Sequence, residues 1–137
     1  MTKQDRKFFE SARRNSLESD FYNNIHIGCV AVYKGKIISN GYNCNKTHPE
    51  QKVYNGYRTL YDEANIKHSM HAEMMCLNKI NENFQRNKIK LYIYRTRKDI
   101  PHGMSRPCEA CMQRIRNMGI KNIYYTTNEG YAHEEII

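Results

Sequence analysis

Hydrophobic and polar positions change their spacing several times along the chain, and each change predicts a structural element. Near the N-terminus, Phe8, Phe9 and Ala12 lie at helical spacing, with charged residues elsewhere on the same turn. Thr2 precedes them in the position of an N-cap residue. The pattern predicts a helix over residues 2 to 18 whose apolar side covers a sheet.

Apolar runs of strand length predict four strands. Residues 27 to 33 form a buried, β-branched run, and residues 37 to 42 resume it after a polar break. Gly35 in this break favours a tight turn, so the two runs predict an antiparallel hairpin. Residues 88 to 94 alternate between apolar and polar, and residues 120 to 126 form a further apolar run, which predicts strands three and four.

Helical spacing returns twice between these strands. Met70, Leu77 and Phe84 belong to an apolar stripe that predicts a second helix, with Ser69 placed to cap it.

A third helix is predicted to begin at Pro107, because proline suits the first helical position. Its stripe runs from Cys108 to Met118, and Gly119 provides the stop.

Strands that alternate with helices after an initial hairpin predict an α/β domain. The 137 residues are most simply one domain, 1–137, with a core that needs no disulfides. The eleven residues that follow the fourth predicted strand are too few for both a helix and a strand. We therefore expect a mixed sheet of four to five strands, covered by helices.

Composition excludes some classes of protein. The five cysteines are irregularly spaced, which argues against a disulfide framework. The N-terminus is charged from its third residue, and no apolar run approaches membrane-spanning length. We therefore expect a cytoplasmic protein without a membrane segment. The net charge of +8 would suit a polyanionic partner, although a biased coding composition rich in lysine and asparagine would produce the same value.

The connection from residue 43 to residue 69 has no periodicity, and such long irregular loops in compact domains are usually functional. It contains basic groups interleaved with tyrosines: Lys46, His48, Lys52, Tyr54, Tyr57, Arg58 and Tyr61. Such residues can bind phosphates and stack on bases, but tyrosines that pack a loop onto the body would give the same pattern.

The predicted second and third helices both begin with residues that can bind a metal. His71, Cys108 and Cys111 would supply one imidazole and two thiolates, which is a typical zinc ligand set. Three protein ligands leave a position for water, and Glu73 would lie outside the ligand shell, close enough to accept a proton.

A structural zinc site is the rival interpretation, and it requires a fourth ligand. The candidates are Cys44, Cys76, His48, His68 and His102. The protein would then be a nucleic-acid-binding module stabilised by zinc.

The motif His71-Ala72-Glu73, combined with Pro107-Cys108-x-x-Cys111, resembles the zinc-dependent cytidine, deoxycytidylate and tRNA-adenosine deaminase superfamily. The similarity extends over roughly residues 5 to 126. It implies a three-layer α/β/α fold, zinc held by the histidine and the two cysteines, and Glu73 as the proton shuttle.

The resemblance also implies substrate contacts. Asn43 matches the position that bonds the substrate sugar, although asparagine is also common in turns that end strands. Tyr124 and Tyr125 fall where base-contacting aromatics occur in the family, and since neighbours on a strand face opposite sides, we select Tyr125. Ala72 and Arg106 complete the predicted set, and Arg106 replaces the small or acidic residue of many relatives.

The predicted activity is hydrolytic deamination of cytosine to uracil. Single-stranded DNA or RNA is narrowly favoured as the substrate, because four basic residues precede the third helix: Arg95, Arg97, Lys98 and Arg106. A free pyrimidine nucleotide or nucleoside, such as (d)CMP or cytidine, is the first alternative. A tRNA-adenosine substrate is the second, since C4 of cytosine and C6 of adenine call for the same chemistry.

Overall fold

The structure, a computed structural model, describes residues 1–19, 25–45, 51, 53, 70–97 and 102–136. Several residues named above lie outside this part of the chain: Lys46, His48, Lys52, Tyr54, Tyr57, Arg58, Tyr61, His68, Ser69 and Lys98. The predictions that rest on them therefore stay predictions, with one exception: the second helix has His71 as its N-cap residue, so the prediction that Ser69 caps this helix was wrong.

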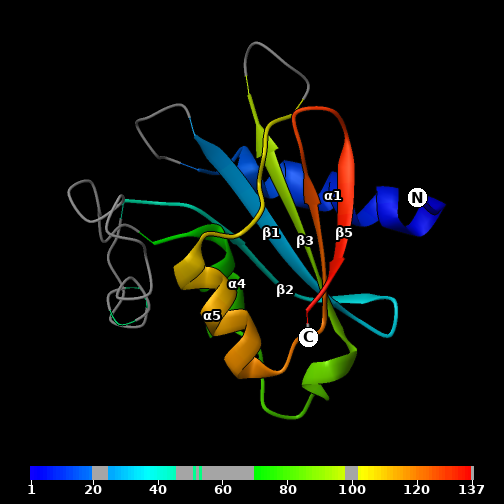
Figure 1. The fold of residues 1–137 in the computed structure, drawn as a ribbon, viewed down its shortest axis with the longest axis vertical. Helices are drawn as coiled ribbons and strands as arrows, with labels where there is room; N and C mark the ends of the chain where they lie inside the picture. The colour runs from blue at the N-terminus through cyan, green and yellow to red at the C-terminus, as the bar shows by residue number, and fades with distance from the viewer. Residues whose placement is uncertain (20–24, 46–50, 52, 54–69, 98–101, 137) are drawn as a thin grey trace.

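One five-stranded sheet forms the centre of the fold, in the order β2-β1-β3-β4-β5 (Figure 1). Its strands are β1 (His26–Tyr33), β2 (Lys36–Tyr42), β3 (Ile89–Thr96), β4 (Asn122–Thr126) and β5 (Tyr131–Glu135). Only the β3–β4 pair is parallel, while β1–β2, β1–β3 and β4–β5 are antiparallel. The predicted mixed sheet with an initial hairpin is therefore confirmed.

Within the described residues, the helices α1 (Lys3–Ser16), α4 (Ala72–Asn78) and α5 (Glu109–Met118) cover the sheet from both sides, as the α/β/α prediction requires (Figure 1). Helix α1 covers one face, and α4 and α5 cover the other. A short 3₁₀ helix, η2 (Arg86–Lys88), leads into β3. In the described part of the chain, no helix has the length and apolar character that crossing a membrane requires.

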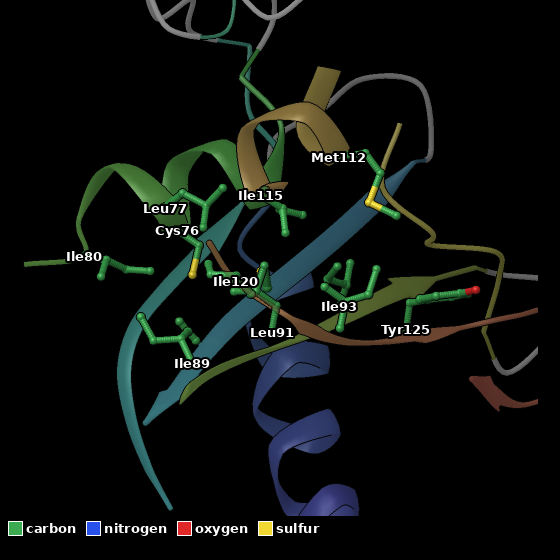
Figure 2. Close-up of a cluster of buried hydrophobic side chains, with 14 of the residues drawn as sticks. Cys76, Leu77, Ile80, Ile89, Leu91, Ile93, Met112, Ile115, Ile120 and Tyr125 are labelled. Atoms are coloured by element: carbon green, nitrogen blue, oxygen red, sulfur yellow. The ribbon is translucent and has the colours of Figure 1, made fainter. Parts of the chain in front are cut away.

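The two faces of the sheet have separate cores. On the α1 side, Phe8, Phe9 and Ala12 pack against side chains of β1 and β3, among them Tyr92. On the other side, fifteen buried residues join the helices α4 and α5 to the sheet (Figure 2). Alternation along the strands divides the two sets, because successive side chains point to opposite faces.

Local chemistry explains why the elements begin and turn as predicted. Thr2 caps α1 in a capping box: its Oγ1 accepts a hydrogen bond from the Asp5 amide, and the Asp5 carboxylate accepts one from the Thr2 amide. The hairpin turns at Lys34 and Gly35, whose φ angles of 50° and 78° suit a two-residue turn. Gly119 ends α5 with a left-handed φ of 83°, as predicted.

The second helix is shorter than predicted. Helix α4 ends at Asn78, and the chain then turns, with the Asn81 side chain accepting a hydrogen bond from the Asn83 amide at 3.0 Å. Phe84 packs on the ring of Tyr33 from this turn, with ring centroids 5.0 Å apart. Apolar residues of the turn fell at helical spacing by coincidence, so the prediction of a helix to Phe84 was wrong.

Boundaries also differ at the third helix and at the C-terminal end of the sheet. Pro107 precedes the N-cap Cys108 and is not the first helical residue, so the prediction of a helix that begins at Pro107 was wrong. The fourth strand begins at Asn122, because Ile120 bonds back to Ile115 where α5 ends. The residues after β4 form a hairpin strand, β5, which pairs with β4 and brings the sheet to five strands.

Candidate metal centre

The helices α4 and α5 bring the predicted metal ligands together. His71 is the N-cap residue of α4, and Cys108 is the N-cap residue of α5. Cys111 follows in the first turn of α5 and is fully buried. Neither N-cap side chain makes a capping hydrogen bond with its own helix, and the two side chains instead lie close to each other between the helix ends.

The distances between the donor atoms fit a zinc ion. His71 Nδ1 lies 3.4 Å from the Sγ of Cys108 and 3.4 Å from the Sγ of Cys111. The three donor atoms all lie within 4.8 Å of one another. Ordinary zinc–sulfur and zinc–nitrogen bonds at a tetrahedral angle would separate sulfur from nitrogen by about 3.6 Å. One imidazole and two thiols therefore have both the chemistry and the spacing to hold zinc.

No fourth protein ligand joins the three among the residues that the structure describes. Cys44 pairs through its backbone with Met70, and Cys76 is fully buried in the same core cluster as Cys29. The Nδ1 atom of His102 lies 2.7 Å from the carbonyl oxygen of Thr127. Three protein ligands leave one tetrahedral position for water, as a hydrolytic site requires.

The two cysteines differ in their affinity for protons. A hydrogen bond from Cys111 lowers the pKa of Cys108 to about 3, and His71 acts in the same direction. The same hydrogen bond and complete burial raise the pKa of Cys111 well above its usual range. A bound dication favours the thiolate form of both residues, since thiolates are the species that zinc coordinates.

Glu73 lies beside the ligands and is nearly inaccessible to solvent, with 4% of its surface exposed. Burial raises the pKa of its carboxyl group to about 7, against an opposing effect of His71. A hydrogen bond with Cys111 also acts on this carboxyl group, which places the carboxylate in contact with the ligand cluster. A buried carboxyl group with a near-neutral pKa can both accept and release a proton.

Close contact between β2 and α4 positions the histidine. A Cβ atom on Gly41 would lie 2.4 Å from the carbonyl oxygen of Ala72 and 2.6 Å from the amide nitrogen of Cys76. Only glycine allows the strand and the helix to approach this closely. Gln51, which is fully buried, accepts a hydrogen bond from the His71 amide at 3.0 Å.

A buried hydrogen-bond network fixes the segment that precedes α5. The Ser105 hydroxyl donates to the carbonyl of Ile93 at 3.0 Å and contacts the Thr126 hydroxyl at 2.9 Å. Thr126 in turn donates to the carbonyl of Gly103 at 2.6 Å. The chain is therefore attached to the ends of β3 and β4 just before the Pro107-Cys108 motif.

The predicted sugar contact Asn43 follows β2 and is buried. Its Oδ1 accepts a hydrogen bond from the Ile27 amide at 2.9 Å, and its Nδ2 donates to the Ile25 carbonyl at 2.7 Å. The amide thus joins the end of β2 to the start of β1. Contact with a substrate sugar stays a prediction.

The other predicted substrate contacts lie around α5 and β4. Tyr124 and Tyr125 face opposite sides of the sheet, and Tyr125 lies on the side of the metal ligands. Figure 2 shows Tyr125 with its hydroxyl oxygen pointing away from the other labelled side chains. Ala72 is fully buried at the start of α4. Whether these residues and Arg106 touch substrate stays a prediction.

Arg106 and Tyr125 share one partner, Glu134 of β5. The Nε and Nη2 atoms of Arg106 donate to the two carboxylate oxygens of Glu134, each at 3.0 Å. The Tyr125 hydroxyl donates to the same carboxylate at 3.1 Å. Glu134 therefore orients two of the residues that were predicted to contact substrate.

Gln51, Ser105 and Glu134 were missed by the sequence interpretation. None of them belongs to a motif, and each acts through a segment distant in sequence. Glu134 lies in the stretch whose structure was left open, and Gln51 lies in the loop that was predicted to be functional without a fixed spacing.

A family profile, the cytidine and deoxycytidylate deaminase zinc-binding region, matches residues 2–127. No match was found among curated protein sequences. The structure resembles the dCMP deaminase of cyanophage S-TIM5 in its apo form, with 21% identity over 93% of this chain and 86% of that one, and a TM-score of 0.62. The same enzyme solved in complex with dCMP and dUMP gives 22% identity, 93% and 84% coverage, and a TM-score of 0.62.

A cytidine deaminase from Burkholderia pseudomallei is similar as well, with 16% identity over 98% of this chain and 93% of that one, and a TM-score of 0.64. At these identities the solved structures establish the shared fold. The profile covers most of the chain and includes His71, Cys108 and Cys111. The chain therefore belongs to the cytidine and deoxycytidylate deaminase family and is a zinc-dependent deaminase.

Proposed function

We propose that the protein hydrolyses the exocyclic amine of cytosine in a free pyrimidine nucleotide, giving uracil and ammonia. The observation that carries this proposal is the arrangement of three converging ligands, His71, Cys108 and Cys111, with the buried carboxyl group of Glu73 beside them. A solved structural neighbour was crystallised with dCMP and dUMP, which supports a nucleotide substrate.

A neighbour solved with dCMP and dUMP, together with one contact in the structure, moves the preference from single-stranded nucleic acid to a free nucleotide. Arg106 is engaged by the carboxylate of Glu134, so its charge is already largely balanced. A free nucleotide requires only one phosphate contact, whereas a polynucleotide requires several.

His71, Cys108 and Cys111 would hold the zinc ion, with His71 binding through Nδ1. When bound, zinc acts as a Lewis acid that lowers the pKa of a coordinated water molecule toward about 7. The helix dipole at the start of α5 favours the thiolate form that zinc binding requires, and it opposes the hydrogen bond with Cys108 and the burial that raise the pKa of Cys111.

Glu73 would move the protons of the reaction. Its carboxylate accepts a proton from the attacking water and delivers it to N3 of the cytosine ring, while the water oxygen bonds to C4. The same residue then takes the proton of the hydroxyl group now on C4 and passes it to the exocyclic nitrogen, the C4–N4 bond breaks as the C4 carbonyl forms, and ammonia leaves. Burial of Glu73 keeps bulk water from competing for these protons.

Replacing Glu73 by glutamine tests the proposal, because the variant keeps the shape of the side chain and removes the proton acceptor. We expect Glu73→Gln to retain zinc, measured by metal analysis, and to lose ammonia release by a factor of about 10³. Glu109→Gln is the matched control, since Glu109 lies between the zinc-binding cysteines but is exposed. Unchanged turnover in Glu73→Gln would refute the mechanism.

The substrate class is tested with the unmodified protein. Ammonia release is measured with dCMP, cytidine, a cytosine-containing single-stranded oligonucleotide and a tRNA that offers adenosine. We expect turnover with the mononucleotide. Activity confined to the oligonucleotide would restore the polynucleotide prediction, and inosine formation would place the substrate in the tRNA-adenosine class.

A further inference from the structure

A cavity lies on the face of the sheet opposite the metal ligands. Its volume is about 550 Å³, which is within the range of small-molecule sites. The start of α1, the β1–β2 turn, η2 and the first residues of β3 and β4 surround it. These elements meet below the N-terminal half of α1 and away from α4 and α5 (Figure 1).

Strand register directs basic side chains into this cavity. Lys90 is paired with Val32 of β1 and with Asn122 of β4, so the three side chains share one face. Val32 belongs to the core beneath α1, which identifies that face as the α1 face. Lys34 and Lys88 lie two residues from Val32 and Lys90 respectively, and all three lysines line the cavity.

The three ammonium groups form no close ion pair among the described residues, although the charge of Lys90 acts on the Asp5 carboxylate. Lys34, Lys88 and Lys90 are exposed. In the described part of the chain, none of them takes part in a salt bridge or a side-chain hydrogen bond. Like charges that converge on one cavity repel each other, and an anion bound between them relieves the repulsion.

One carboxylate, that of Asp5, also lines the cavity. Its two oxygens are already engaged, by the Thr2 amide at 3.1 Å and by the Tyr92 hydroxyl at 2.6 Å. Asp5 offsets one of the three positive charges, so the lysines and Asp5 together leave the cavity positive. Asn87 and Asn122 add amide groups to the lining.

Stacked rings give the cavity a rigid wall. The rings of Tyr92 and Tyr124 stack with centroids 4.5 Å apart at an angle of 6°, and His133 stacks on the other side of Tyr124 at 4.3 Å. Asn122 contacts the His133 ring nitrogen at 2.8 Å. Side chains held in this way do not need to be ordered when a ligand binds, which favours affinity.

We propose that this cavity is a second binding site, selective for an anion that carries two or more phosphate charges and held by Lys34, Lys88 and Lys90. The site is separate from the metal ligands and does not depend on the deamination chemistry. A diphosphate group, whether free or part of a larger molecule, matches the three separated positive charges, because phosphate oxygens accept hydrogen bonds from ammonium groups.

The test titrates the zinc-loaded protein with inorganic pyrophosphate by calorimetry. Lys88→Gln combined with Lys90→Gln removes two of the cavity charges, and we expect the affinity to fall about tenfold or more. Lys7→Gln combined with Lys79→Gln is the matched control, because it removes the same charge from lysines that do not line the cavity. Any extraction of zinc by the probe affects both double variants equally, so their comparison isolates the cavity.

A second titration with single-stranded oligothymidylate identifies the source of the phosphate. Pyrophosphate binding that depends on Lys88 and Lys90 indicates a small phosphorylated ligand. Oligothymidylate binding with the same dependence indicates the phosphates of a polynucleotide backbone. Equal weakening by the two double variants, or no binding of either probe, would overturn the proposal.

Discussion

The helices on the two faces of the sheet differ in how their N-termini are capped. Helix α1 begins with a complete capping box formed by Thr2 and Asp5. Helices α4 and α5 begin at His71 and Cys108, whose side chains make no capping hydrogen bond. A side-chain cap contributes about 1 kcal/mol. The α1 face is therefore stabilised by its own sequence, whereas the other face uses its N-cap positions for metal ligands.

Helix length strengthens the contrast. Helix α1 has 14 residues, whereas α4 has seven. A seven-residue helix is unstable in isolation, so α4 depends on packing and on the ligand at its N-terminus. We therefore expect zinc to stabilise one face of this fold in addition to supplying its chemistry.

Zinc removal is expected to have the largest effect, and to act on one face. A ligand present at a thousand times its dissociation constant stabilises a fold by about 4 kcal/mol. Chelation should therefore lower the free energy of unfolding by several kcal/mol and increase amide hydrogen exchange in α4 and α5, while α1 retains its protection. Hydrogen-exchange mass spectrometry measures both faces in one experiment. Equal loss of protection in α1 would contradict the proposed division between the faces.

Two glycines offer a paired test, because each lies where a helix touches a strand. A Cβ on Gly41 would clash with α4, and a Cβ on Gly28 would lie 2.0 Å from the carbonyl oxygen of Ala12 in α1. Both substitutions by alanine should destabilise the fold by about 1–3 kcal/mol or more, which urea unfolding measures. Only Gly41→Ala should also reduce the zinc content of the folded protein, because it displaces the helix that begins at His71. Normal zinc content in Gly41→Ala would show that the contact does not position the ligand.

The two faces also differ in how far the sequence predicts them. Strand periodicity, the Thr2 cap and the Gly35 turn are local signals, and the structure confirms each of them. The metal ligands were predictable because zinc requires particular side chains, and because both ligand segments start at helix ends. A site that requires particular residue types can therefore be predicted from the sequence without knowledge of the fold.

Contacts between distant segments could not be predicted in this way. Glu134 bonds with Arg106 across 28 positions of sequence, and Gln51 contacts the His71 amide across 20 positions. Both sequence separations are far longer than the few residues over which a helical or strand pattern relates side chains. The C-terminal end of α4 was predicted wrongly for a related reason. Phe84 lies at helical spacing in the sequence, but it packs against Tyr33 from the turn that follows the helix.

Strand β5 contributes to both faces, and alternation along it separates their roles. Glu134 points to the side of the metal ligands and orients Arg106 and Tyr125, whereas His133 stacks on Tyr124 on the α1 side. Glu134→Gln weakens the charged pair with Arg106. If Arg106 and Tyr125 contact substrate, KM should rise about tenfold with kcat nearly unchanged.

Steady-state kinetics with dCMP measure this effect, and His133→Gln is the control from the opposite face. A similar increase of KM in both variants would indicate a general loosening of β5. Restoration of the wild-type KM by Glu134→Asp would support a role of the carboxylate in orienting its partners.

The smallest effect is expected from the cap of α1. Thr2→Ala removes one hydrogen bond of the capping box and should lower the free energy of unfolding by about 1 kcal/mol, without changing zinc content or turnover. Thr2→Ser keeps the hydroxyl and should behave as the wild type. Loss of zinc in Thr2→Ala would show that the two faces are coupled.

Acid titration tests the contribution of Asp5, the other residue of the capping box, to the stability of the fold. Burial raises the pKa of the Asp5 carboxyl group, but hydrogen bonds from Tyr92 and Thr2 outweigh it and hold the pKa below its usual 3.8. The folded state therefore binds a proton at Asp5 less readily than the unfolded state does. The contribution of the Asp5 carboxylate to the free energy of unfolding is present above pH 3.8, and it is lost as the pH falls through the lower pKa of the folded state. Urea unfolding of the wild type should show this loss, and Asp5→Asn should show a shallower dependence on pH in the same range. Parallel pH profiles would mean that the cap is stabilised by the hydroxyl of Thr2 and not by the charge of Asp5.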